Sequence, residues 1–277
     1  MPALRSAPLA TPDPLSSASQ DYRYATLTDG EAGQATLADE VALAIAYNGI
    51  SQAVMLVSPR DLEDFVVGFS IASGIVPAIE DVYDIQVRGL GASREAQVDI
   101  SSRAFWALKD HRRQMAGTSG CGLCGVEAVD QALPTLPILE PMPLPPAAWL
   151  EGLRQRLSAL QPLGQHSGAV HAAAFMNAHG ELMLAREDIG RHNALDKLIG
   201  ALLRQGIDTA GGLVVVTSRC SLELIQKMLR AGIHTLVSLS SPTGLACQWA
   251  RKHHLNLIHL PHHSAPRVYS PAMEIEP

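Results

Sequence analysis

The chain has 277 residues, of which 47% are hydrophobic and 17% charged, so it is long enough to bury one or two hydrophobic cores. Its formal net charge of −6 excludes a general basic surface for binding a nucleic-acid backbone. Its apolar runs, such as 41–47 and 213–216, are far shorter than the roughly 18 residues that a membrane-spanning helix needs. We therefore expect a cytoplasmic globular protein with no nucleic-acid or membrane partner.

The first 20 residues are rich in Pro, Ser and Ala and contain Arg5 as their single cation. This composition predicts a flexible tail and not a signal peptide. Residues 21–135 are expected to form a smaller, β-rich N-terminal subdomain that opens with antiparallel sheet. Its predicted elements are a hairpin at Asn48-Gly49, a helix from Pro59-Arg60-Asp61, and strands at 84–88 and 97–100.

Two cysteines, Cys121 and Cys124, lie among glycines in the stretch GTSGCGLCGVEAVD. Structural zinc would need two further ligands, yet there is no second CxxC, and Cys220 and Cys247 stand alone. A redox dithiol is a closer alternative, because the short helix expected after the pair could lower a thiol pKa. The glycines predict a mobile loop over 117–126, which suits a thiolate that carries sulfur between two places. Spacing alone leaves the redox and carrier readings open.

Prolines concentrate in residues 136–146, which predicts a linker before a C-terminal α/β subdomain over 147–277. This subdomain is expected to contain a helix over 147–160 and two strands joined at His179-Gly180. A β-α-β-α-β pattern then runs from Leu213 to Leu260 and predicts a parallel sheet. Ligands bind beyond the carboxyl ends of such strands, which here are the loops 217–221, 240–243 and 260–265.

The phrase REDIGRHNALDKLIG, residues 186–200, is dense in polar residues and runs into an amphipathic helix. With Asn193 as the N-cap and Asp196 three residues later, Arg191 and His192 would lie beside the positive end of that helix, a place that suits a phosphate. The plainer alternative is a well-capped surface helix. Arg219 and the hydroxyls of the 217–221 loop could face the same phosphate or could only cap the next helix.

Five histidines crowd residues 253–263, but their spacing matches no usual set of metal ligands, and we expect no metal site there. His171 lies in a predicted strand with small neighbours. A buried, hydrogen-bonded histidine is the plainer expectation for it.

The motifs CGLCG, REDIGRHNALDK, TSRCSLELIQK and SPTGLA, together with AIAYNG and VVGF, make the chain from about Glu40 to Tyr269 resemble the FdhD family of formate dehydrogenase accessory sulfurtransferases. The resemblance implies a homodimer with a cytidine-deaminase-like, three-layer α/β core. It also implies a sulfur carrier that takes persulfide sulfur from a cysteine desulfurase. The sulfur would pass to the molybdenum bis(molybdopterin guanine dinucleotide) cofactor before formate dehydrogenase receives that cofactor. Cys121 would carry the persulfide, and Cys124 would assist or relay it.

A cofactor with two pyrophosphates and two guanines would need anion sites on several loops. The candidate cofactor-binding residues are Arg186, Asp188, Arg191, His192, Asn193, Lys197, Thr217, Ser218, Arg219, Ser221, Ser241, Thr243, Leu260, Pro261, His262, His263, Ser264 and Ala265. The family has a basic residue in the last of these loops, whereas this chain has two histidines, which replace a cation only in part at neutral pH.

The implied fold raises the question of deaminase activity, whose signature is H-x-E followed by P-C-x-x-C with zinc. Here Ala172 and Ala173 follow His171, and the CxxC pair comes earlier in the chain. We therefore predict neither bound zinc nor deamination. Two alternatives to the sulfur carrier stay open: a non-catalytic chaperone for the molybdenum cofactor, and a dithiol oxidoreductase.

Overall fold

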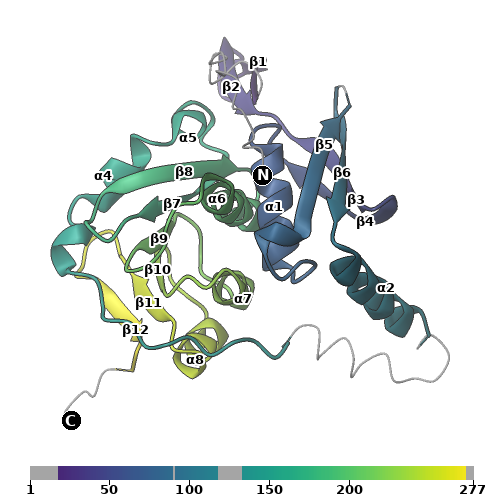
Figure 1. The fold of residues 1–277 in the computed structure, drawn as a ribbon. Coiled ribbons are helices and arrows are strands. Elements are labelled where there is room, and N and C mark those ends of the chain that lie inside the picture. Colours follow the sequence, from purple (N-terminus) through teal and green to yellow (C-terminus); the bar gives the residue numbers. More distant parts are fainter. Residues whose placement is uncertain (1–17, 90, 118–132, 273–277) are drawn as a thin grey trace.

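The structure is a computed structural model that describes residues 18–89, 91–117 and 133–272. Two halves, each with its own sheet, stand side by side with helices α1 and α6 between the sheets (Figure 1). The strands are β1 (Ser19–Ala25), β2 (Ala32–Ala38), β3 (Val41–Tyr47), β4 (Ile50–Val57), β5 (Val82–Arg88), β6 (Ser93–Ile100), β7 (His171–Met176), β8 (Leu182–Asp188), β9 (Leu213–Val216), β10 (Thr235–Ser238), β11 (Asn256–His259) and β12 (Arg267–Ser270). The helices are α1 (Leu62–Ala72), α2 (Ser102–Gly117), α4 (Leu153–Ser158), α5 (Pro162–Ser167), α6 (Arg191–Gln205), α7 (Leu222–Arg230) and α8 (Gly244–Lys252), with 3-10 turns η1 (Ile79–Asp81) and η2 (Ala147–Leu150).

The N-terminal half is built on a four-stranded sheet in the order β4-β3-β6-β5. Asn48 and Gly49 both have positive φ, and they join β3 to β4 in the predicted antiparallel hairpin. The sheet is nevertheless mixed, because β6 lies parallel to β3. One face of the sheet packs on α1, and the Tyr47 hydroxyl meets Ser70 Oγ at 2.7 Å inside this core. Helix α2, which our sequence analysis did not predict, follows β6 and projects beyond the sheet (Figure 1).

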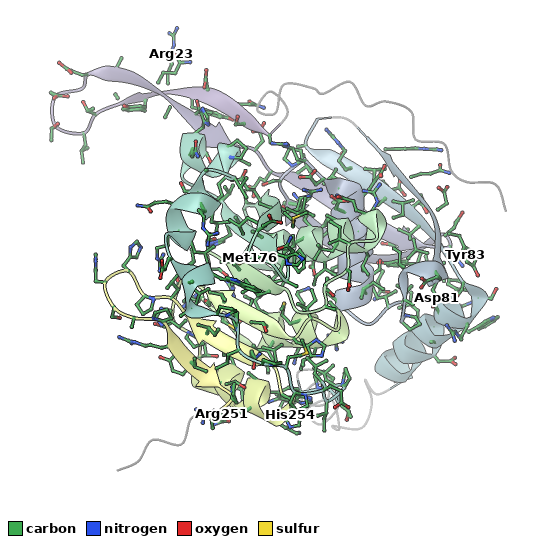
Figure 2. All side chains as sticks on the ribbon, turned by 60° about the vertical axis from the view of Figure 1, so that its left-hand side comes forward. Arg23, Asp81, Tyr83, Met176, Arg251 and His254 are labelled. Atoms are coloured by element: carbon green, nitrogen blue, oxygen red, sulfur yellow. The ribbon has the colours of Figure 1, made fainter. Side chains whose placement is uncertain are left out.

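Strands β1 and β2 form a separate two-stranded ribbon. The far end of the ribbon projects from the molecule, as the position of Arg23 shows (Figure 2), while β2 also lies against α5 of the C-terminal half. The expected tail over 1–20 therefore extends too far, since β1 already begins at Ser19; residues 1–17 lie outside the described part.

The C-terminal half contains a six-stranded sheet in the order β12-β11-β10-β9-β7-β8. Strands β9, β10 and β11 are parallel, which confirms the predicted β-α-β-α-β unit. Strand β7 runs antiparallel to both β8 and β9, and β12 closes the other edge antiparallel to β11. Helices α6, α7 and α8 cover one face and α4 and α5 the other, so this half has three layers (Figure 1). Its likeness to cytidine deaminases stays a prediction.

Two predicted segments before this sheet differ in detail. The single helix expected over 147–160 is split into η2 and α4, because Gly152 between them has a φ of 58°. The proline-rich segment 136–146 contains neither helix nor strand, as expected. Its Leu136 and Leu139 are buried against the C-terminal core, and Leu139 N donates to His253 O at 3.1 Å. The segment is therefore packed along the second half rather than free between the two.

Helices α1 and α6 cross at very close range, and glycines make this possible. A Cβ at Gly68 would lie 1.7 Å from Asp196 O, and a Cβ at Gly200 would lie 1.8 Å from Asp64 O. Since no side chain fits at either position, the two backbones are in direct contact. This crossing fixes how the two halves sit against each other.

Candidate functional site

The segment 186–200 covers the end of β8, a short turn and the first turns of α6. The predicted N-cap is wrong: α6 begins at Arg191, its N-cap is Gly190, and Asn193 is a buried residue of the first turn. The side chain of Asp188 explains the difference. Its Oδ1 accepts Gly190 N at 2.8 Å and Asn193 Nδ2 at 2.9 Å, so a carboxylate from the preceding strand holds the start of the helix.

Asp188 also forms a buried ion pair with Lys197. Its Oδ2 lies 2.6 Å from Lys197 Nζ, and both side chains are fully buried. Burial lowers the pKa of Lys197, and the Asp188 charge opposes that effect. Lys197 Nζ donates to Ser58 O at 3.0 Å, and Asp188 Oδ2 accepts Ser58 N at 2.9 Å. Asn193 Nδ2 adds a bond to Leu56 O at 2.8 Å. These residues tie the end of β4 to β8 and α6; we call them the buried knot.

Arg186 also links the two halves of the molecule. It lies 2.8 Å from Asp64 Oδ2 on α1, and Arg204 of α6 meets the other oxygen of Asp64 at 2.5 Å. Arg186, Asp188, Asn193 and Lys197 were expected to contact a ligand. The structure gives each of them partners within the protein, which hold the two halves together, and their contact with the cofactor stays a prediction.

The residues left for a ligand lie at the N-termini of α6 and α7. His192 Nε2 lies 2.5 Å from Glu223 Oε2, which brings the first turns of the two helices together. Arg191 Nε and Ser221 Oγ are buried there, and neither has a hydrogen-bond partner among the described residues. Burial lowers the pKa of His192, whereas Glu223 raises it. Both helix ends are positive, which favours an anion at this corner, although the Glu223 carboxylate also lies there.

His171 begins β7 opposite Asp188, and it is half-buried rather than buried. Burial lowers its pKa, and the nearby Arg191 charge lowers it further. It therefore borders the same corner as a neutral group at pH 7.

The predicted hydroxyl residues position the neighbouring loops. Thr217 Oγ1 accepts Ala172 N at 2.9 Å, Ser218 Oγ donates to Arg219 O at 3.1 Å, and Thr243 caps α8 by accepting Ala246 N. Ser218 is buried, whereas Arg219, Ser241 and Thr243 are exposed. Arg219 is thus the residue of the 217–221 loop that presents a charge to solvent.

The last predicted loop, 260–265, follows β11 and exposes His262, His263, Ser264 and Ala265, with Leu260 and Pro261 half-buried. It is held by Arg154 of α4, a residue that the sequence analysis missed. Arg154 Nη2 donates to Leu239 O at 2.6 Å and also to Leu260 O. No local pattern could have revealed Arg154, because these partners lie 85 and 106 residues away.

The crowded histidines do not converge. His253 Nδ1 bonds Pro137 O at 2.9 Å, His254 Nδ1 bonds Leu139 O at 3.1 Å, and His259 stacks on Tyr269. Within the described ranges, no group of three His, Cys, Asp or Glu side chains is placed to hold a metal. Cys121 and Cys124, the loop 117–126 beyond Gly117, and the helical turns expected after it lie outside the described residues.

The sequence profile of the FdhD/NarQ family matches residues 38–276. The chain belongs to the FdhD/NarQ family. Two relatives named sulfur carrier protein FdhD are each 45% identical to it. The one from Bordetella petrii aligns over 87% of this chain and 88% of its own, and the one from Cupriavidus necator over 80% and 77%.

A solved structure shares the fold of this FdhD/NarQ family member. It is a protein of Desulfotalea psychrophila described as a formate dehydrogenase accessory protein, with a TM-score of 0.70 at 24% identity. The match covers 92% of this chain and 98% of that one. In the part of the chain that the structure describes, none of the helices has the length and apolar character needed to cross a membrane.

Proposed function

We propose that this chain is a cytoplasmic sulfur carrier for formate dehydrogenase, acting as a homodimer. In this proposal Cys121 accepts sulfur from a cysteine desulfurase and passes it to the molybdenum bis(molybdopterin guanine dinucleotide) cofactor. Family membership and the relatives named sulfur carrier protein FdhD support the sulfur-carrying part. The description of the structural neighbour supports the link to formate dehydrogenase.

The chemistry needs one free thiolate and no external oxidant. The Cys121 thiolate attacks the outer sulfur of the donor's persulfide, a new S–S bond forms on Cys121, and the donor leaves as a thiolate. Attack by Cys124 on the Sγ of that persulfide would release hydrosulfide and leave a Cys121–Cys124 disulfide, which a thiol reductant must reopen. In this step Cys124 assists by releasing the sulfur, whereas its attack on the outer sulfur would relay the persulfide to Cys124 and free the Cys121 thiolate. The buried Cys220 does not compete as a thiolate, because burial raises its pKa to about 12.

The observation that best supports cofactor binding is the corner formed by the N-termini of α6 and α7. The two unpartnered buried atoms, Arg191 Nε and Ser221 Oγ, are donors, and a pyrophosphate or a guanine-linked phosphate would satisfy them. Arg219 and the loops at 240–243 and 260–265 lie at the same end of the parallel strands. The cofactor is thus a client bound at the sheet's carboxyl edge, and no zinc takes part.

Two measurements test this function. The first is peptide mass spectrometry after the protein is mixed with a cysteine desulfurase and cysteine without reductant, with Cys121→Ala as the comparison. One added sulfur on the Cys121 peptide supports the carrier. A Cys121–Cys124 disulfide alone would point to an oxidoreductase. No added sulfur, with formate dehydrogenase still activated by Cys121→Ala, would point to a chaperone.

The second measurement is calorimetric titration with guanosine diphosphate, a fragment of the proposed client. Arg191→Gln is expected to weaken binding by about 10- to 150-fold, because it removes a charge-assisted bond worth ~1.5–3 kcal/mol. Arg23→Gln is the matched control, since Arg23 is an exposed arginine on β1, away from the corner (Figure 2). Equal binding by both variants would reject the corner as the anion site.

A further inference from the structure

Helix α2 carries an exposed aromatic surface in the half of the molecule that leads to the CxxC pair. Trp106 is 54% exposed and Tyr83 on the adjoining β5 is 68% exposed. Lys109 Nζ lies 5.2 Å from the centre of the Phe105 ring and 4.8 Å from that of Trp106. We call Tyr83, Phe105, Trp106 and Lys109, together with Arg103, the aromatic patch.

The patch is mounted rigidly. Ala104 and Leu108 are buried in the N-terminal core, so one face of α2 is fixed against the sheet and Trp106 points away from that face. At the start of the helix, Asp81 Oδ1 accepts Ser101 Oγ at 2.5 Å, and Asp81 Oδ2 pairs with Arg103 at 3.1 Å. Asp81 and Tyr83 lie beside this end of α2 (Figure 2). Ordered aromatic rings lose little conformational entropy when a partner covers them.

The composition of the patch is that of a protein-binding hot spot. Trp, Tyr and Arg are the residue types most enriched in such spots, and this chain has only 3 Trp and 5 Tyr. The patch also carries the cation Lys109, in a chain whose net charge is −6, whereas the charge of Arg103 is already paired with Asp81. A surface of this kind favours a partner with an acidic rim around an apolar centre.

The position of the patch indicates which partner this is. Helix α2 ends at Gly117, four residues before Cys121. From Trp106 to Gly117 the helix rises about 16 Å, and four further residues reach at most about 14 Å. A protein seated on the patch could therefore place its own cysteine within reach of Cys121. The anion corner belongs to the other half of the molecule, so the patch is not part of it.

We propose that the aromatic patch on α2 is the docking surface for the protein that donates sulfur to Cys121, a persulfide-bearing protein with an acidic rim. This inference rests on the proposed function, because it presupposes that Cys121 accepts sulfur from another protein. In this arrangement Trp106 provides the apolar anchor and Lys109 pairs with the rim, while Arg103 stays paired with Asp81.

The test measures docking and sulfur loading separately. Binding of a cysteine desulfurase is measured by biolayer interferometry in a Cys121→Ala background, with Trp106→Ser, Lys109→Glu and the control Met183→Ser, which changes an equally exposed apolar residue on β8. The expected result is at least tenfold weaker binding for Trp106→Ser and Lys109→Glu, no change for Met183→Ser, and weaker wild-type binding at higher salt.

Loading of Cys121 is then followed by mass spectrometry in the Cys121-containing proteins. With the desulfurase at low concentration, Trp106→Ser should load at least tenfold more slowly, and high desulfurase concentration should restore the rate. Inorganic polysulfide, which needs no docking, should load Trp106→Ser and wild type equally. Failure of both donors on the wild type would reject the proposed function, while the binding comparison would still decide the docking surface.

Three results would overturn the docking surface. The first is equal desulfurase binding by all variants. The second is slower polysulfide loading of Trp106→Ser, which would mean that Trp106 supports the cysteine segment instead. The third is conversion of a wild-type dimer to a monomer by Trp106→Ser in size-exclusion chromatography with light scattering, which would assign the patch to a second copy of the chain.

Discussion

Replacing Lys197 by methionine separates a structural role for this residue from the ligand contact that its motif suggests. The ammonium is fully buried, 2.6 Å from Asp188, and bonded to Ser58 O. Methionine has nearly the same length but neither charge nor donor. Lys197→Met therefore leaves the Asp188 carboxylate charged inside the knot with no counterion.

Removing one partner of a buried ion pair costs about 3–5 kcal/mol of the unfolding free energy. The lower end applies here, because Asp188 would still accept bonds from Ser58 N, Gly190 N and Asn193 Nδ2. We expect Lys197→Met to lose about 3 kcal/mol. The double variant Asp188→Asn with Lys197→Met leaves no buried charge, so its loss should be smaller than the sum of the two single losses by about 1–3 kcal/mol.

Urea unfolding at pH 7.5, followed by circular dichroism, measures these losses. Guanosine diphosphate affinity is measured in parallel under native conditions, where the structural account predicts less than a twofold change. A loss below about 1 kcal/mol together with a tenfold weaker affinity would refute the buried knot. That result would restore Lys197 as a direct ligand contact.

Three further changes follow from the joint and the anion corner. Gly200→Ala would place a Cβ 1.8 Å from Asp64 O, so it should cost about 3 kcal/mol or more in urea unfolding, whereas Gly244→Ala, with open space around it, should cost less than about 1 kcal/mol. Burial raises the pKa of Asp196 to about 6, against the opposing Lys227 charge. The neutral carboxyl therefore contributes fully to the unfolding free energy below the unfolded pKa of about 3.9, and this contribution is lost by about pH 6. The unfolding free energy should fall by roughly 3 kcal/mol between these pH values. Asp196→Asn should remove this pH dependence. Burial lowers the pKa of His192, so guanosine diphosphate affinity should rise below pH 6, where this side chain becomes charged. A flat pH profile in the wild type would contradict this, and so would an unchanged rise in His192→Gln.

Local sequence patterns were sufficient to predict those elements that a few neighbouring residues determine. Asn48-Gly49 fixed the hairpin, and the apolar runs at 213–216 and 256–259 became parallel strands separated by amphipathic helices. Each of these depends on neighbours only a few residues away, so a single sequence can show it.

The remaining features depend on residues distant in sequence. The sequence around Asp188 and Asn193 is typical of a polar surface segment. Their partners Ser58 and Leu56 lie about 130 residues earlier, and the hydrogen bonds to them hold both side chains in the interior. A dense run of charged residues usually lies in solvent. Here burial could not be inferred without knowing that β4 ends beside β8.

The same joint has a consequence for sulfur transfer. The aromatic patch belongs to the small sheet and the anion corner to the large one, and the glycine crossing of α1 and α6 puts the backbones of the two halves in direct contact. Ion pairs of Asp64 with Arg186 and Arg204 brace this crossing. Rotating one half on the other would break the backbone contact, the buried knot and these pairs together, at a cost comparable to the roughly 5–15 kcal/mol that holds a domain folded if each contributes a few kcal/mol. If sulfur is accepted beside the aromatic patch, we therefore expect it to reach the anion corner without rotation of one half on the other.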